Sequence, residues 1–169
     1  MDAMQAILSR RSIRKFGTAS INETDIHELL DAAMSAPSSS NGQPWHFIVI
    51  TDRKILDEIP KFHPYSNMIK EAPLAFIICG DLNLEKGKGV WVQDCSAATE
   101  NLLIAANAKG LGAVWLGVYP IANRVTGVCW LLGLPAHIVP LCIVAVGHPA
   151  EKKPPANRFN LDRIHRDKW

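Results

Sequence analysis

The residues with the clearest chemical potential form a basic segment near the N-terminus, Arg-Arg-Ser-Ile-Arg-Lys-Phe at positions 10–16. The segment places four cations within six positions, beside two apolar residues. If its backbone is extended, alternate side chains share a face, so that Arg10, Ser12 and Arg14 point the same way. Two guanidinium groups and a hydroxyl on one face suit a phosphate or another compact anion.

A helical backbone gives the same segment a different interpretation. Arg10 and Arg14 then still share a face, Ser12 lies on another, and the cations form the solvated end of a first helix, where positive charge is favourable. A basic run by itself does not separate these two interpretations. Residues 151–169 carry six Lys or Arg against three acids, and we expect the two basic ends of the chain to meet in the fold.

The length and composition indicate a single globular domain. The 169 residues are 48% hydrophobic and 20% charged, enough for a sizeable core. A net charge of +2 is too small to favour nucleic acid as a partner. No apolar run has the length of a membrane span and the N-terminus lacks the order of a signal peptide, so we expect a cytoplasmic protein. The four cysteines include no C-x-x-C pair and the six histidines are scattered, which argues against disulfides and metal sites.

Hydrophobic patterns predict strands that alternate with helices. Strands are expected at residues 46–50, 74–79, 113–118 and 141–146, and helices at 2–8, between Asn22 and Pro37, at 52–59, 90–109 and 124–132. The longest helix is apolar or small nearly all round, which is typical of a core helix or of one shared with a second subunit. The alternation indicates an α/β or α+β domain of three layers with about four core strands.

A polar loop, Pro-Ser-Ser-Ser-Asn-Gly-Gln-Pro-Trp at positions 37–45, runs directly into one of these strands. Loops in this position often hold binding groups, but a solvated connector has the same composition, and both interpretations stay open. The glycine-rich fingerprints of nucleotide-binding loops are absent. A bound phosphate would therefore be held by side chains, which favours the arginines.

Four stretches in this order resemble the flavin (FMN)-dependent nitroreductase family, of which the chain would be a compact member. They are the basic segment, residues 36–45, Gly-Leu-Gly at 110–112 leading into Trp-Leu-Gly at 115–117, and Val-Gly-His-Pro at 146–149 with Arg-Phe at 158–159. The first two are the more specific. Together they span nearly the whole chain.

The resemblance implies an α+β fold, a three-layer sandwich around a mainly antiparallel sheet. It implies one domain over residues 1–169, with the tail at 151–169 wrapping the partner subunit of a homodimer that holds FMN non-covalently at its interface. The residues that the resemblance assigns to FMN are Arg10, Arg11, Ser12, Arg14, Pro37, Ser38, Ser39, Asn41, Gln43, Trp115, Leu116, Gly117 and Arg158. The arginines look like contacts to the phosphate, ribityl chain and ring, residues 37–43 resemble a loop supplied across the interface, and Leu116–Gly117 the turn whose amide lies near flavin N5.

The resemblance also implies the reaction. FMN would take hydride from NAD(P)H and then reduce a small electron-poor acceptor, such as a nitroaromatic or a quinone, by a ping-pong scheme in which no side chain acts as a catalytic acid or base. Three alternatives stay open: another flavin reaction such as reductive dehalogenation or flavin breakdown, a flavin carrier or sensor without turnover, and a protein whose arginines are only surface charge.

Overall fold

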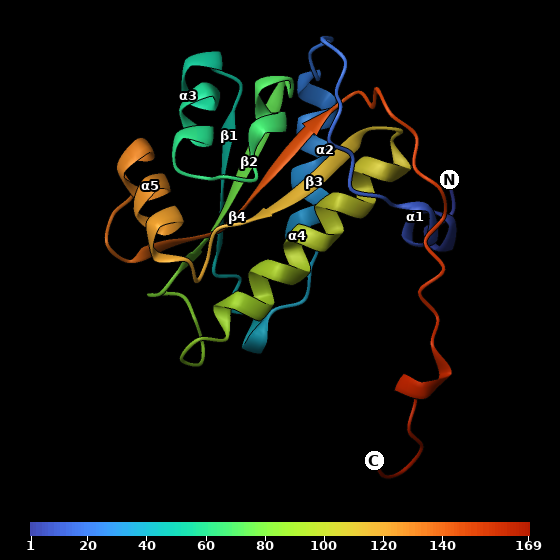
Figure 1. The fold of residues 1–169 in the computed structure, drawn as a ribbon. Helices are drawn as coiled ribbons and strands as arrows, with labels where there is room; N and C mark the ends of the chain where they lie inside the picture. The colour runs from blue at the N-terminus through green and yellow to red at the C-terminus, as the bar shows by residue number, and fades with distance from the viewer.

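A four-stranded antiparallel sheet forms the centre of the protein, which is described by a computed structural model of residues 1–169. The strands are β1 (Trp45–Ile50), β2 (Leu74–Asp81), β3 (Gly112–Gly117) and β4 (Ile138–Gly147). They lie in the order β1-β2-β4-β3, and every neighbouring pair is antiparallel (Figure 1). β1 and β3 are therefore the two edges, and the expected α+β sandwich with a mainly antiparallel sheet is confirmed.

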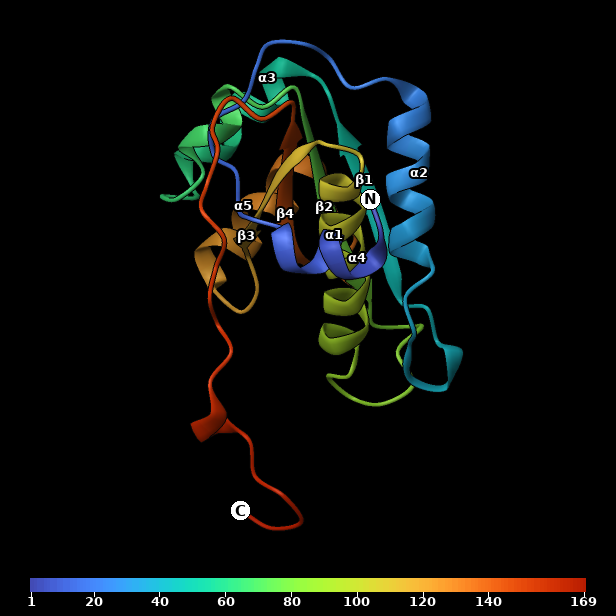
Figure 2. The same ribbon diagram turned by 90° about the vertical axis from the view of Figure 1, so that its right-hand side faces the viewer.

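Helices cover both faces of this sheet. The helices are α1 (Ala3–Ser9), α2 (Glu23–Met34), α3 (Arg53–Glu58), α4 (Trp91–Ala108) and α5 (Ala122–Leu132). One core cluster joins α2 and α4 to the sheet, and a second joins α3 and α5 to the opposite face. Figure 2 shows α2 on one side of the strands and α3 and α5 on the other. The three-layer prediction thus follows from strands that are apolar on both faces, as in β2, all of whose residues are buried.

Local signals set the ends of the helices. The side chain of Asn22 accepts a hydrogen bond from the Asp25 N–H and caps α2, as its residue type predicts. Helix α4 ends at Ala108, two residues before Gly110, whose φ of 76° lies in the left-handed region that glycine adopts without strain. The residue types at Asn22 and Gly110 were therefore sufficient to predict where α2 begins and where α4 ends.

Strand β4 begins earlier than the apolar run indicates. It starts at Ile138 rather than near residue 141, and it includes Pro140, which pairs with Cys79. The register shifts between Ile78 and Cys79, and this bulge accommodates a proline that cannot donate to the ladder.

The two basic ends of the chain meet, as expected. Phe16 forms a bridge with Pro149, and the backbone carbonyl of Ser12 accepts a hydrogen bond from Lys153 Nζ at 2.7 Å. Figures 1 and 2 both show the last residues of the tail extending away from the sheet and helices. No helix of the protein has both the length and the apolar character that crossing a membrane requires.

Candidate functional site

The basic segment is extended beyond α1, not helical. Ser12 forms a parallel bridge with Ala113 of β3, and the Ile13 N–H donates to the Ala113 carbonyl at 3.0 Å. The buried side chains of Ile13 and Phe16 fix the segment to the body of the protein. The charged side chains before Ile13, and those between Ile13 and Phe16, therefore lie along the edge of the sheet.

The arginines at the start of this segment share a hollow of about 260 Å³ with the tail, lined by Arg10, Arg11, Asn157 and Arg158 among others. Arg11 Nε donates to the Pro154 carbonyl at 2.8 Å, which ties the tail to the segment across the chain. Three guanidinium groups from opposite ends of the sequence thus line one concave surface. Phosphate is the group that such a cluster recognises best.

One of these guanidinium groups has an unused donor, and another is already paired. Arg11 Nη2 is a buried nitrogen with no hydrogen-bond partner, whereas Arg10 Nε lies 3.0 Å from Glu100 Oε1 in an ion pair. Buried donors are nearly always satisfied by a partner. The unused donor of Arg11 fits a phosphate group with close to two negative charges.

A second hollow, of about 430 Å³, lies further along the same segment and contains Arg14, Tyr65, Asn67, Trp115, Leu116 and Gly117. Two cations, Arg14 and Arg124, line it and no acidic side chain does. An extended chain rises about 3.3 Å per residue, so Arg10 and Arg14 mark points roughly 13 Å apart. The segment therefore connects a phosphate-sized arginine cluster to a larger, partly aromatic hollow.

Gly117 presents its backbone to this second hollow. Backbone groups of an edge strand alternate between the neighbouring strand and the outside. The Val118 N–H donates to the Leu141 carbonyl of β4 at 3.1 Å, whereas the Ala113 carbonyl accepts from Ile13 on the outside. Gly117 lies four residues after Ala113, so its backbone groups point to the same side of the strand, and both its N–H and its carbonyl point away from β4.

No contact within the chain explains a glycine at position 117. A Cβ built on Gly117 meets no atom within 4 Å, and its φ is not in the left-handed region. Open space in front of a strand backbone is typical of positions where a ligand approaches closely. The predicted role of Gly117 beside a flat ring is consistent with this space.

Two residues absent from the predicted site, His63 and Arg124, contact the same glycine. His63 Nε2 and Arg124 Nη1 each lie 2.9 Å from the Gly117 carbonyl oxygen. Burial of the His63 ring, followed by the nearby charge of Arg124, lowers the pKa of His63 despite its hydrogen bond to Gly117. No periodic pattern covers residues 61–70, which include His63, and Arg124 is far from His63 along the chain. The spacing of residues therefore gave no signal for this contact.

This pKa predicts that acid destabilises the protein through His63. The unfolded chain takes up a proton on this imidazole near pH 6.5 and the folded chain does not, so the free energy of unfolding falls as the pH drops below about 6.5. The slope from this one group is at most about 1.4 kcal/mol per pH unit. Chemical denaturation between pH 7.5 and 5 measures it. His63→Gln is expected to flatten the slope, and an unchanged slope would assign it to other groups.

The loop at 37–43 lies at the other edge of the sheet, before β1, and lines neither hollow. Ser40, Asn41 and Gln43 have φ values of 47°, 54° and 46°, which is strained for residues with a side chain. The Ser39 N–H donates to Asp94 Oδ1 at 2.9 Å, and Gln43 Nε2 donates to Asn41 Oδ1 at 2.8 Å. The loop is thus held in a defined shape, separate from the arginines of its own chain.

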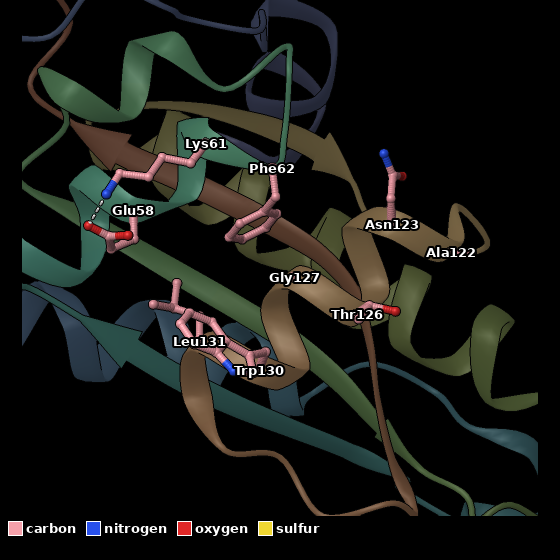
Figure 3. A pocket seen from close by; sticks show the side chains of 9 residues that line it. All are labelled: Glu58, Lys61, Phe62, Ala122, Asn123, Thr126, Gly127, Trp130 and Leu131. Carbon is pink, nitrogen blue, oxygen red and sulfur yellow. Dashed lines mark hydrogen bonds and ion pairs between the residues drawn. The ribbon is translucent and has the colours of Figure 1, made fainter.

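A third hollow, of about 540 Å³, opens between α5 and the segment that precedes His63 (Figure 3). It contains none of the predicted FMN residues. Figure 3 shows the ring of Phe62 beside α5 at Gly127, and a Cβ built on Gly127 would lie 2.4 Å from Phe62 Cγ. Close packing, not chemistry, explains this glycine.

Gly127→Ala is therefore expected to destabilise the protein by about 1–3 kcal/mol, the usual cost of overpacking. Thermal and denaturant unfolding measure the loss. Thr126→Ala, on the same helix and on the rim of the same hollow, serves as the control. Equal stability of Gly127→Ala and the parent protein would show that Phe62 can move without cost.

Both the sequence and the fold match known proteins. A model of the Nitroreductase family matches residues 7–63 and 63–148. A protein of Methanothermobacter thermautotrophicus with the provisional name NADH dehydrogenase/NAD(P)H nitroreductase is 49% identical over 169 residues, which are 100% of this chain and 88% of that protein. A crystal structure from Parabacteroides distasonis with the same provisional name superposes with a TM-score of 0.95 at 42% identity, over 99% of this chain and 98% of that one.

A third relative, a provisionally named nitroreductase from Desulfovibrio desulfuricans, was solved in complex with FMN. It has a TM-score of 0.87 and 28% identity, and the alignment covers 100% of this chain and 98% of that chain. The matched segments include the basic segment, the loop at 37–43 and all four strands. The chain belongs to the nitroreductase family.

Proposed function

We propose that this protein is an FMN-dependent oxidoreductase that takes hydride from NAD(P)H and passes it to small electron-poor acceptors such as nitroaromatics or quinones. The observation that carries the proposal is the pair of hollows joined by the segment at 10–14, one lined by three arginines and the other by Trp115 and the open backbone of Gly117. Phosphate at one end and a flat ring at the other is the chemistry of FMN. The FMN complex of the Desulfovibrio relative supports this cofactor.

Arg10, Arg11 and Arg158 would hold the phosphate. Each charge-assisted hydrogen bond contributes on the order of 1.5–3 kcal/mol, although such contributions need not add. Ser12 and Arg14 lie along the path between the two hollows and would contact the ribityl chain and the polar edge of the ring. Arg14 would also favour the negative charge that the ring gains on reduction.

A second copy of the chain would complete the site. Residues 37–43 lie at the β1 edge and the arginines at the β3 edge, so one chain cannot bring both to the same FMN. In a twofold dimer, the strained loop with Pro37, Ser38, Ser39 and Asn41 would reach the cofactor bound by the partner subunit. The dimer interface would then contain two equivalent sites. The exposed tail side chains Phe159, Leu161 and Ile164 would be covered by the partner subunit.

FMN, when bound, would supply the hydride-transfer chemistry. The chain's own residues bind and orient. Trp115 and Tyr65 flank the hollow in which the nicotinamide and the acceptor would lie in turn. The two cations there, Arg14 and Arg124, would attract the anionic nicotinamide cofactor and the partly negative oxygens of a nitro group or a quinone. Because donor and acceptor would use one place, ping-pong kinetics are expected.

The visible spectrum tests the proposal. The purified protein, loaded with FMN if necessary, is expected to show a flavin spectrum that NADH or NADPH bleaches without oxygen and that a quinone or nitro compound restores. A spectrum that persists after both nicotinamides would replace this reaction by another flavin reaction or by a carrier function. A protein that takes up no FMN would refute the proposal.

Mixed dimers test the two-chain site. An Arg10→Ala/Arg158→Ala chain and an Asn41→Ala chain, each defective as a homodimer, would form mixed dimers in which one site has both defects and the other has none. Co-expression with two affinity tags is expected to yield dimers that bind one FMN per two chains with the parent affinity. Weak binding by every mixed dimer would show that loop and arginines serve the same site from one chain.

A further inference from the structure

The carbonyl of Gly117 receives two donors from separate parts of the fold. His63 follows the 3₁₀ turn Ile59–Lys61, and Arg124 lies in the first turns of α5. Their nitrogens Nε2 and Nη1 are each 2.9 Å from the same oxygen. Two donors use both lone pairs of the carbonyl, so its direction is fixed from two sides.

The geometry also defines the tautomer of His63. A backbone carbonyl only accepts, so the hydrogen between the two groups must be on Nε2. Nδ1 is buried and has no partner, so a proton there would be an unsatisfied donor beside the positive charge of Arg124. The ring is therefore a neutral Nε2–H donor near neutral pH. The other donor, Arg124, packs on an aromatic ring: its Cζ lies 5.5 Å from the centre of the Tyr65 ring.

Gly117 is a residue whose backbone needs such support. It is the last residue of an edge strand, it has no side chain to pack, and glycine has more backbone freedom than any other residue. Its N–H and carbonyl point to the same side of the strand, away from β4. The carbonyl belongs to the peptide group after the Gly117 Cα and the N–H to the group before it, so the donor pair acts on the N–H through the φ and ψ angles of this glycine, whose range it narrows.

We propose that His63, together with Arg124, is a positioning residue of the flavin site: the two side chains hold the Gly117 carbonyl, and thereby keep the Gly117 N–H directed at flavin N5. This inference rests on the function proposed above. His63 itself makes no contact with the reacting atoms in this scheme, because its donor nitrogen is occupied by the carbonyl.

The proposal predicts the sign of a redox effect. N5 of oxidised flavin accepts a hydrogen bond, whereas N5 of reduced flavin carries a hydrogen and cannot accept one in the same way. A rigid N–H donor therefore favours the oxidised state, and releasing it raises the midpoint potential. A tenfold loss of affinity for oxidised relative to reduced FMN corresponds to about 30 mV for a two-electron couple.

The test compares FMN-loaded parent protein with His63→Leu, His63→Gln and His27→Leu. Leucine removes the donor, glutamine restores an amide donor near the position of Nε2, and His27 is an exposed histidine on α2, on the other face of the sheet. The readouts are the midpoint potential and, in the FMN-free chains, the amide resonance of Gly117. We expect His63→Leu to raise the potential and shift the resonance, and His63→Gln and His27→Leu to stay near the parent values.

Arg124→Gln provides a second route if His63→Leu does not fold, since Arg124 is only half-buried. Its readout is the Gly117 amide resonance of the FMN-free chain, which is expected to shift, because the loss of the Arg124 charge by itself lowers the potential. A parent-like potential in His63→Leu with FMN bound normally, or an unshifted Gly117 resonance in both variants, would overturn the positioning role and leave the proposed function intact. Failure of the parent protein to bind FMN would instead refute the proposed function, and the positioning role with it.

Discussion

Replacing Arg158 with alanine is expected to weaken FMN binding by about ten- to a hundred-fold, the equivalent of one charge-assisted hydrogen bond to phosphate. The side chain reaches the arginine hollow from the tail and is exposed, so the change leaves the FMN-free fold unaffected. Equilibrium titration with FMN, followed by quenching of flavin fluorescence, measures the affinity. Unfolding of the FMN-free protein is measured in parallel and is expected to match the parent.

Arg166→Ala is the matched control, because it removes the same charge from the same tail outside the hollow. Only Arg158→Ala should lose affinity beyond a general charge effect, and the difference should shrink as salt screens the phosphate. Equal losses in both variants would mean that the tail acts through its overall charge. Unchanged affinity in Arg158→Ala would remove the tail from the phosphate site.

Gly117→Ala is expected to separate cofactor binding from stability. The added methyl group meets no atom of the chain, and alanine restricts the unfolded backbone, so the FMN-free protein should be as stable as the parent or more stable by up to about 1 kcal/mol. The same methyl group would occupy the space in which the flavin ring approaches the backbone. FMN affinity should therefore fall by about tenfold or more.

The comparison with Gly127→Ala makes this prediction specific. That substitution adds the same atoms against Phe62, so it should lower stability and leave the arginine hollow unchanged. Thermal unfolding of the FMN-free chains and titration of the folded chains with FMN give a stability and an affinity for each of the two variants. A Gly117→Ala protein that binds FMN like the parent would show that the ring does not lie against β3.

Most of the architecture could be predicted because its causes are local. The apolar run before Gly80 predicts a buried strand, and Asn22 and Gly110 mark helix ends through the hydrogen bond and the backbone angle that they supply. The start of β4 could not be predicted in this way. Pro140 argues against a central strand, and only the bulge in β4 beside it, where the register with β2 shifts, makes room for it.

The site was predictable to the extent that it depends on charge and motif. The family is confirmed, and the meeting of Arg10 and Arg11 with Arg158 follows from basic residues at two chain ends. The contact of His63 with Gly117 could not be foreseen, because it depends on which edge of the sheet β3 occupies. The role of the loop at 37–43 stays a prediction, since a single chain holds it away from the arginines.

The edge position of β3 has a consequence for the behaviour of the protein in concentrated solution. An exposed edge strand is a template on which strands of other molecules add, and this is a common route to aggregation. Here the outward carbonyl of Ala113 accepts the Ile13 N–H, and that of Gly117 accepts His63 and Arg124. The contacts that shape the site thus also close this edge, so that no continuous row of free acceptors is left for an intruding strand.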